Sequence, residues 1–249
     1  MPCAFISLTH PGRVRPNNED AIALEPAIGL AVLADGMGGY NAGEVASAMA
    51  TTHIARLLGP QAPAGLTEDA VVRAVESANR AIWAAAATHA EYSGMGTTVV
   101  VALFGEGRLL LAHVGDSRAY RVRGGQLVQL TRDHSFQQEQ IDAGLLMPEE
   151  AFTAPHRNLV TRALGVEATV EVEIHGHGVL PEDLYLLCSD GLSDMLPDAE
   201  LAALLAGGGN LAEMADRLVD AANARGGRDN ISVILACPAP TAPAAVGGP

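Results

Sequence analysis

Ala31-Val-Leu-Ala-Asp-Gly-Met-Gly-Gly-Tyr40 runs from an apolar segment directly into a glycine-rich turn. Leu30–Ala34 is a continuous apolar run with the length of a buried strand, so we expect Asp35 at the tip of that strand. Three glycines follow within four positions, and their backbone can adopt a positive φ or approach a ligand closely. Mg²⁺ and Mn²⁺ prefer oxygen ligands, so Asp35 and a neighbouring carbonyl could form half of a cation site. Aspartate followed by glycine is also common in turns, which leaves an ordinary turn as the alternative.

Three further aspartates stand at expected strand boundaries, each beside a small or polar residue: Asp116, Asp190 and Asp229. Strands that end at one place could bring these acids and Asp35 together, whereas four independent surface turns would leave them apart. Crowded carboxylates repel one another unless cations stabilise their charged form. Two divalent cations ~3.5–4 Å apart can hold a bridging hydroxide and stabilise both oxygens of an in-line displacement. The recurrence therefore favours a two-metal site.

Composition limits the kinds of partner. With 249 residues, 49% of them hydrophobic, the chain can bury one large core, and we expect one domain. Lys and Arg total 15 against 29 for Asp and Glu, which gives a formal charge of −14. Such a field opposes binding to a nucleic-acid backbone, so we expect no nucleic-acid partner. An anionic substrate would need local positive charge, which bound divalent metals supply.

Cysteine usage and hydropathy indicate the compartment. Cys3, Cys188 and Cys237 are odd in number and form no CxxC pair, so we expect reduced, mostly buried thiols rather than disulfides or a zinc site. The sequence has no secretory leader pattern, and no window approaches the ~20 apolar residues of a membrane span. These features predict a soluble cytoplasmic protein without a membrane partner.

Periodicity predicts an alternation of strands and helices, with antiparallel hairpins in the middle of the chain. We expect strands at Phe5–Leu8, Val99–Phe104, Arg108–Val114, Ala119–Val122, Leu127–Leu130, Val170–Ile174, Leu184–Cys188 and Ile231–Cys237. We expect helices at Ala42–Leu58, from Thr67 to about His89, in a short stretch that begins at Leu196-Pro197-Asp198, and at Leu211–Ala224. Trp83, the only tryptophan, is expected in the core.

Two segments lack such periodicity. Residues 131–161 form a mixed helical and irregular insertion, typical of a lid or recognition loop. Residues 238–249 contain only Pro, Ala, Gly, Thr and Val, so we expect a disordered tail after a folded domain of residues 1–237.

A polar cluster near the N-terminus contains Arg15, Glu19 and Asp20. It could be a solvated turn with an internal ion pair. Alternatively, the planar guanidinium of Arg15 could bind a phosphate through two hydrogen bonds, which lysine would do less well. Local sequence leaves both interpretations open.

Seven short motifs follow one another along the chain: Arg15-Pro-Asn-Asn-Glu-Asp20, Ala34-Asp-Gly-Met-Gly-Gly39, Gly96-Thr-Thr98, Val114-Gly-Asp-Ser-Arg118, Leu130-Thr-Arg-Asp-His-Ser135, Cys188-Ser-Asp-Gly-Leu-Ser-Asp194 and Asp229-Asn-Ile-Ser232. Together they resemble the metal-dependent Ser/Thr protein phosphatases of the protein phosphatase 2C family, in a form similar to the bacterial branch. The resemblance spans residues 7–236. Each motif alone is a weak signal, whereas seven in the family's order are a strong one.

The resemblance implies an α+β fold, a four-layer α-β-β-α sandwich with two central antiparallel sheets flanked by helices. It implies that Asp35 bridges two metals, that Gly36 offers its carbonyl to one, and that Asp190 and Asp229 complete the other. It implies further roles for these residues: metal-water positioning by Glu19 and Asp20, a third metal at Asp116 and Asp194, and phosphate binding by Arg15. Residues 131–161 correspond to the family's variable flap.

One position departs from the pattern. Eukaryotic members have a histidine after the Asp-Gly pair, proposed to protonate the leaving alkoxide, and Met37 stands there in this chain. A thioether carries no proton, so the general acid is left unassigned. His175 and His177 are two positions apart, which is more typical of strand or loop residues than of ligands.

The function implied is hydrolysis of phosphoserine and phosphothreonine in proteins by direct attack of a hydroxide that bridges two divalent metals, Mn²⁺ or Mg²⁺. The implied partners are phosphorylated proteins, a bacterial-type Ser/Thr kinase and its substrates, and we expect a monomer. A non-catalytic phosphoprotein-binding module on the same fold is one alternative, although none of the expected metal acids is missing. A regulator of sigma-factor switching is another, although the sequence has no attached sensor domain.

Overall fold

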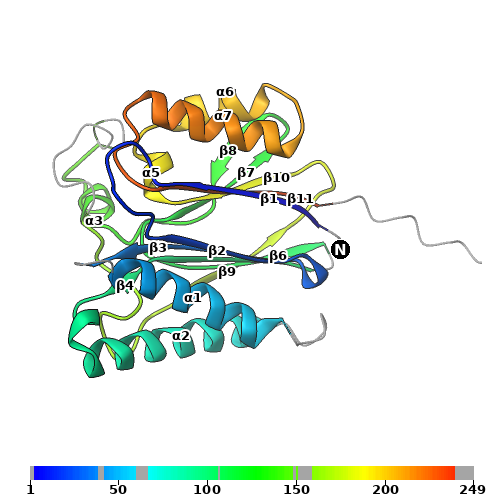
Figure 1. Cartoon of the computed structure of the whole chain (residues 1–249). Coiled ribbons are helices and arrows are strands. Elements are labelled where there is room, and N and C mark those ends of the chain that lie inside the picture. Colours follow the sequence, from blue (N-terminus) through cyan, green and yellow to red (C-terminus); the bar gives the residue numbers. More distant parts are fainter. Residues whose placement is uncertain are drawn as a thin grey trace, which may run out of the picture.

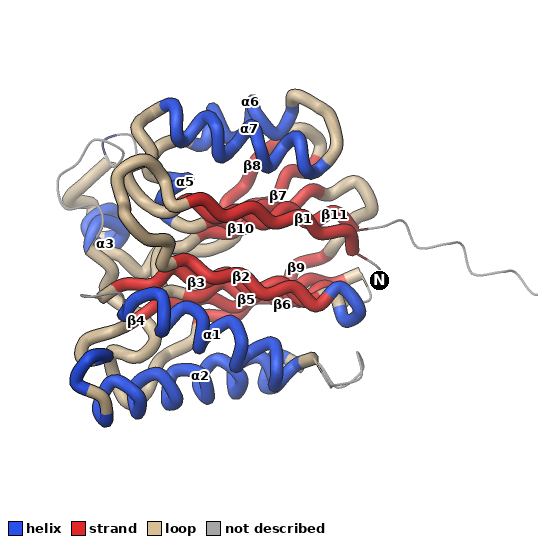
Figure 2. Tube along the Cα trace, in the orientation of Figure 1, coloured by secondary structure: helices blue, strands red, loops and turns tan. Residues whose placement is uncertain are grey.

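Two antiparallel β-sheets pack face to face in the computed structural model, and helices cover the outer face of each (Figures 1 and 2). The structure describes residues 3–38, 42–59, 67–105, 107–147, 150 and 159–238. The predicted four-layer α-β-β-α arrangement is therefore confirmed. Three predicted segments lie partly outside the described residues. They are the end of the glycine-rich turn (Gly39 and Tyr40), most of the second half of the flap, and residues 239–249 of the predicted tail.

The first sheet joins the two ends of the described chain. Its strand order is β1-β11-β10-β7-β8, and Cys3 pairs with Pro238 in the register of its first two strands. The strands are β1 (Cys3–His10), β11 (Ile231–Pro238), β10 (Leu184–Cys188), β7 (Arg118–Arg123) and β8 (Gln126–Gln129).

The second sheet contains the Asp35 strand near its centre. Its order is β2-β3-β5-β6-β9, and the short β4 pairs with the end of β3. The strands are β2 (Asp20–Glu25), β3 (Leu30–Met37), β5 (Val99–Phe104), β6 (Arg108–Val114), β9 (Glu173–Gly178) and β4 (Gly96–Thr97).

The helices lie on the outer faces of the sheets (Figure 1). The second sheet is covered by α1 (Ala42–Leu58) and α2 (Glu68–Thr88), and the first by α6 (Asp198–Ala206) and α7 (Leu211–Ala224). Shorter helices are α3 (Phe136–Asp142), α5 (Asp190–Ser193) and the 3₁₀ turns Pro26–Ile28 and Ala90–Tyr92. The longer helices begin where sequence predicts, because Thr67 caps α2 and Asn210 forms a capping box with Glu213 at α7.

The uninterrupted apolar run in β3 is explained by burial on both faces. Leu30, Val32 and Ala34 pack beneath α1 and α2, whereas Ala31 and Leu33 pack between the two sheets. All five side chains are fully buried. A strand with helices on one side and a second sheet on the other has no solvent face, so the usual alternation with polar residues is absent.

Several predicted boundaries are wrong. β3 continues past Asp35 to Met37, because Gly36 and Met37 pair with β4 after the pairing with β5 has ended at Leu33. The strand expected at Val170–Ile174 begins three residues later, as β9, where pairing with β6 holds it. The turn expected after β10 is the single helical turn α5.

Trp83 was expected in the core, and this prediction is wrong, since it is 42% exposed. The buried side of α2 is formed by Val71, Val75 and Ile82 together with alanines at helical spacing, and Trp83 lies one position beyond that stripe. The position of Trp83 on the helix, outside that stripe, therefore accounts for its exposure.

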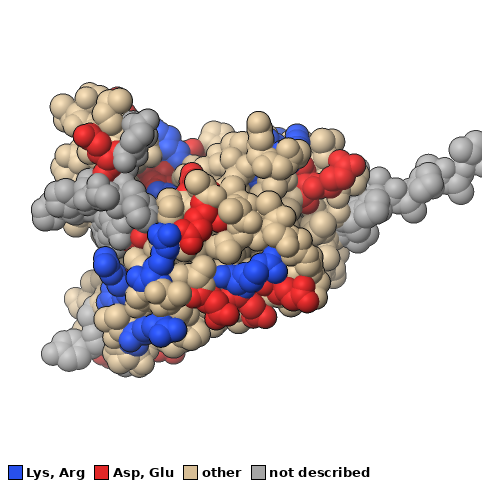
Figure 3. All heavy atoms as spheres, turned by 90° about the horizontal axis from the view of Figure 1, so that it is seen from above, with Lys and Arg blue, Asp and Glu red and all other residues tan. Residues whose placement is uncertain are grey.

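The basic residues of the sequence are all arginine, and on the face in Figure 3 they stand among acidic side chains. Arg108 pairs with Glu68 and Arg225 with Glu200 near the surface. Such exposed pairs contribute little to stability.

Within the described part of the chain, no helix has the length and apolar character needed to cross a bilayer.

The contrast between Ile82 and Trp83 is testable. Ile82→Ala should lower the free energy of unfolding by about 2–5 kcal/mol, because it leaves a cavity under α2. Trp83→Ala should cost about 1 kcal/mol or less, because the indole is partly solvated. Urea unfolding followed by circular dichroism measures both values. A larger loss for Trp83→Ala than for Ile82→Ala would contradict the packing described.

Candidate metal centre

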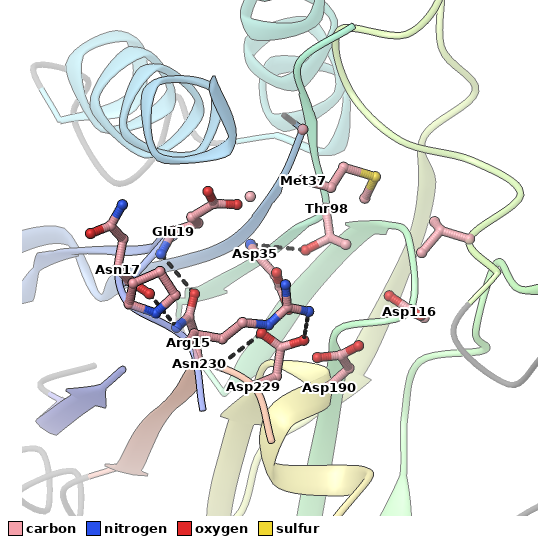
Figure 4. A pocket seen from close by; sticks show the side chains of 14 residues that line it. Arg15, Asn17, Glu19, Asp35, Met37, Thr98, Asp116, Asp190, Asp229 and Asn230 are labelled. Carbon is pink, nitrogen blue, oxygen red and sulfur yellow. Dashed lines mark hydrogen bonds and ion pairs between the residues drawn. The ribbon is translucent and has the colours of Figure 1, made fainter. Parts of the chain in front are cut away.

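A pocket of about 390 Å³ opens where the ends of the two sheets meet, and the four predicted aspartates line it together (Figure 4). Asp35 comes from β3, Asp116 follows β6, Asp190 begins α5 and Asp229 precedes β11. The strands thus bring the acids to one point, and the alternative of four separate surface turns is wrong. Their role as metal ligands stays a prediction.

Asp35 is held by backbone contacts at the point where β3 leaves β5. Its N–H donates to Thr98 Oγ1 at 3.0 Å, and its carbonyl accepts from Thr98 N–H at 2.9 Å and from Thr97 Oγ1 at 2.8 Å. These bonds use both polar backbone groups of Asp35 and leave its carboxylate to face the pocket. The Gly96-Thr97-Thr98 motif had no role assigned from sequence, and the structure supplies one.

Gly36 lies where the N-terminal turn of α1 meets the loop before β2. A Cβ placed on it would be 2.2 Å from Gly43 O and 2.5 Å from Glu19 O, so no other residue fits there. Its N–H donates to Glu19 O at 3.1 Å. Ser47 Oγ donates to the same Glu19 carbonyl at 2.5 Å. Glycine at this position therefore permits the close approach that places Glu19 on the pocket wall.

Two carboxylate oxygens at this site are buried without a hydrogen-bond donor among the described residues. They are Asp20 Oδ1 and Asp190 Oδ1. Asp20 pairs with Asp35 in the register of β2 and β3, and its other oxygen accepts from Ser189 Oγ at 2.9 Å. Asp20 does not line the pocket itself, but it lies directly behind Asp35. Buried anionic oxygens without donors are what a bound cation would satisfy.

The acids raise one another's pKa. Burial, with Asp229 nearby, raises the pKa of Asp20 to about 6. Burial, with Asp133 nearby, raises that of Asp116 to about 7. Burial and neighbouring carboxylates raise the pKa values of Asp35 and Asp190 well above the ordinary range. Carboxyl groups in this environment resist ionisation unless positive charge is supplied.

Arg15 approaches the pocket from the loop after β1 and forms an ion pair with Asp229, with Nη2 2.6 Å from Oδ2 (Figure 4). Its side chain is 55% exposed. Both interpretations left open by the sequence are thus partly met, because Arg15 has an internal ion pair and also lines the pocket.

Asn230 anchors the loop that carries Arg15 and Glu19. Its Oδ1 accepts from Glu19 N–H at 2.8 Å, and its Nδ2 donates to Pro11 O at 3.0 Å and Asn17 O at 2.8 Å. Sequence reasoning missed this function, although the motif that begins at Asp229 contained the signal. One buried amide at the start of β11 therefore sets the geometry of the whole loop.

Two further predicted positions differ in their placement. Asp194 does not line the pocket, but it lies close enough to contribute to the raised pKa of both Asp116 and Asp190. Met37 does line it, and no histidine does so among the described residues. The pocket thus offers oxygen donors, a guanidinium and a thioether, a donor set suited to hard cations rather than zinc.

The sequence is similar to a known family and to named proteins. Residues 13–236 match the family model described as "Protein phosphatase 2C". A Listeria innocua protein named "Serine/threonine phosphatase stp" is 38% identical over 237 residues, which cover 91% of this chain and 92% of that protein.

Solved structures are also similar. The Mycobacterium tuberculosis serine/threonine phosphatase PstP/Ppp superposes with a TM-score of 0.90 at 39% identity, covering 96% of this chain and 99% of that one. The PstP catalytic domain in complex with two manganese ions gives a TM-score of 0.88 at 39% identity, with the same coverage of both chains.

The raised pKa values predict how the metal-free chain responds to pH. Folded values near 6 and 7 lie above the value of about 3.9 for aspartate in an unfolded chain. Stability contributed by these protonated acids is fully present below about pH 3.9 and is lost progressively as the pH rises from there through the folded values of about 6 and 7. The gain in Tm on replacing EDTA with Mn²⁺ should therefore be larger at pH 8 than at pH 5. Calorimetric scans that give equal gains at both pH values would contradict the crowding of buried acids.

Proposed function

Because the chain belongs to the protein phosphatase 2C family of serine/threonine phosphatases, we propose that its pocket of aspartates is the catalytic centre and binds two divalent cations. The chain is a metal-dependent serine/threonine protein phosphatase that acts on phosphoproteins. One observation supports the assignment to this pocket above all. Asp20 and Asp190 each have a buried carboxylate oxygen that accepts no hydrogen bond from a described residue, and three more aspartates lie beside them.

The residues present fit the cations. Asp35, placed between the other acids, would bind both, the carbonyl of Gly36 would bind one, and Asp190 with Asp229 would bind the other. Manganese is supported by the related PstP domain, which was solved with two manganese ions, and Mg²⁺ is the alternative with the same preference for oxygen. When bound, such cations lower the pKa of water and neutralise phosphate charge. A third ion at Asp116 and Asp194 is supported by the closeness of the two carboxylates, since Asp194 contributes to the raised pKa of Asp116.

The other side chains act on the phosphate and on water. Arg15 can donate two parallel hydrogen bonds to phosphate oxygens, and its exposed guanidinium at the rim can reach an incoming phosphoprotein. Glu19 lines the pocket and would accept a hydrogen bond from water there, which orients the water toward phosphorus. Asp20 would share this role only with water that reaches behind Asp35, because it lies outside the pocket lining. No cysteine or histidine lines the pocket among the described residues, so direct attack by water is favoured over a phosphoenzyme formed on either of those side chains. The aspartates of the pocket are assigned to the cations rather than to attack on phosphorus.

The cellular role is also part of the proposal. The phosphatase would oppose a bacterial Ser/Thr kinase and act on that kinase and its substrates. We propose that it acts as a monomer in the cytoplasm, where its three unpaired cysteines would stay reduced. A non-catalytic binding module would be expected to lack some of the acids, whereas all the predicted ones are present.

Removing one metal-binding charge tests the site. Asp190→Asn should lower kcat on a phosphothreonine peptide by at least about a hundredfold at saturating Mn²⁺, because it removes a negative charge from the cation pair. Asp216→Asn makes the same chemical change on the exposed side of α7 and should leave kcat unchanged. Comparable turnover in Asp190→Asn and wild type would exclude the ligand role.

Replacing Arg15 tests phosphate binding. Arg15→Lys keeps the charge but loses the planar fork, so kcat/KM on a phosphopeptide should fall by about tenfold. Arg73→Lys, on the exposed side of α2, is the matched control and should have wild-type kinetics. If Arg15→Lys also has wild-type kcat/KM, Arg15 serves only its ion pair with Asp229.

A further inference from the structure

A second group of titratable side chains lies outside the pocket, where the flap joins the sheets. His113 on β6, His134 at the start of the flap and Glu173 on β9 form a cluster whose ligand atoms all lie within 4.8 Å of one another. The two imidazole rings stack with centroids 4.7 Å apart. Both histidines are buried, at 1% and 9% exposure. Nothing in the catalytic proposal uses these three residues.

The backbone of His134 links the flap to a turn of the catalytic pocket. Its N–H donates to Gly115 O at 2.9 Å, and its carbonyl accepts from Thr161 N–H at 2.8 Å. Gly115 immediately precedes Asp116, which lines the pocket. Thr161 lies at the other end of the flap. The backbone of His134 is thus hydrogen-bonded both to the residue before Asp116 and to the far end of the flap.

The ring of His134 makes a second bond to the same glycine. The Gly115 N–H donates to Nδ1 at 3.1 Å, so Nδ1 must be an unprotonated acceptor. The single proton of the neutral ring then resides on Nε2, which lies 3.2 Å from both Glu173 Oε2 and Arg162 Nη1. Only the carboxylate can accept that proton, and Arg162 has acceptors of its own in the carbonyl and carboxylate of Glu171. Burial, together with the neighbouring His113, lowers the pKa of His134 and keeps the ring neutral. Glu173 therefore orients the ring, and the ring holds Gly115.

The same bonds argue against a metal at this cluster. A cation on His134 Nε2 would displace the proton that faces Glu173, and a neutral ring would then carry its proton on Nδ1. That proton would point at the Gly115 N–H, so two donors would face each other and the hydrogen bond would be lost. His113 Nε2 is also engaged, since it donates to the carbonyl of Arg132 at 2.8 Å. Three of the four imidazole nitrogens are thus already engaged, two by backbone groups and one by Glu173.

The position of Gly115 matters for the catalytic acids. Its φ is +106°, and a Cβ on it would lie 2.6 Å from Thr98 Cγ2, so the glycine packs directly on Thr98. Thr98 Oγ1 bonds to the N–H of Asp35 and lies 2.8 Å from Ser117 Oγ. A shift of Gly115 would therefore move Asp116 directly and disturb the support of Asp35.

We propose that His134 is a positioning residue of this phosphatase, whose ring, oriented by Glu173, holds the Gly115 amide and so fixes the carboxylate of Asp116 in the pocket. Through Thr161 the same residue also ties this turn to the described end of the flap. The proposal rests on the proposed role of Asp116 in the catalytic centre. The ring acts on Asp116 through Gly115 and has no contact with substrate in this account.

The tautomer of His134 is the first test, and it needs no variant and no turnover. In the full-length protein with Mg²⁺, ¹⁵N correlation spectra of the imidazoles should give an unprotonated Nδ1 and a protonated Nε2 for His134. The opposite tautomer would overturn the proposal. Loss of the Nε2 proton on addition of one equivalent of Zn²⁺ would also overturn it, because the cluster would then be a metal site.

Variants provide the second test. His134→Asn keeps a carbonyl oxygen close to the place of Nδ1, whereas His134→Ala removes the acceptor. His175→Ala is the matched control, because His175 Nε2 bonds to the other oxygen of Glu173 at 2.8 Å but the residue is largely exposed. The bidentate ion pair of Arg118 with Asp133 remains in all three variants and keeps the turn and the flap joined.

Hydrogen exchange of the Gly115 amide should accelerate by about tenfold in His134→Ala, the effect of losing one hydrogen bond, and by no more than about threefold in His134→Asn. His175→Ala should exchange like wild type.

On a phosphothreonine peptide, kcat should fall about tenfold in His134→Ala with KM unchanged, and His134→Asn should recover most of it. Equal exchange in His134→Ala and wild type, or an Asn variant as impaired as the Ala variant, would overturn the proposal. Wild type without phosphatase activity but with the expected tautomer and exchange would instead contradict the proposed function.

Discussion

Mutual repulsion among buried carboxylates is the constraint on which the rest of this structure depends. Asp116 is buried, and Asp20, Asp35 and Asp190 are half-buried. Beyond the effect of burial, Asp20, Asp116 and Asp190 each raise the pKa of Asp35, and Asp20 and Asp116 also raise that of Asp190. A folded chain holds such a group together only if its packing is rigid and positive charge reaches it. Arg15 supplies one positive charge through Asp229, and two divalent cations would supply the remainder.

The scaffold provides that rigidity through strands that are buried on both faces. β3 has helices on one side and a sheet on the other, so Asp35 emerges from a segment without a solvent face. The loops around it are tied by side-chain to backbone bonds rather than by apolar packing, with Asn230 holding the Glu19 loop and Thr98 holding Asp35. If His134 holds Gly115 in the same manner, buried polar side chains position Glu19, Asp35 and Asp116 alike.

The sequence predicted the parts of this account that depend on local pattern. Strand runs such as Val99–Phe104 and the amphipathic α7 were predicted with correct bounds, because their apolar spacing has one interpretation. The acids were found because each stands beside a turn residue at the end of a strand. Trp83 was misplaced, because residue type alone was used, whereas its exposure depends on which face of α2 is buried. The roles of Asn230, Thr98 and His134 depend on contacts between residues far apart in sequence, which a single sequence does not contain.

The central claim is that divalent cations bind and ionise the crowded acids of the pocket. Titration calorimetry of the EDTA-treated, dialysed protein with Mn²⁺ at pH 7, repeated in two buffers of different ionisation enthalpy, measures both binding and proton release. Burial raises the pKa of Asp116 to about 7, and burial and neighbouring carboxylates raise those of Asp35 and Asp190 well above the ordinary range. Mn²⁺ binding should therefore release protons, and the release should diminish in Asp190→Asn. Tight binding without proton release, or equal release in the variant, would contradict it.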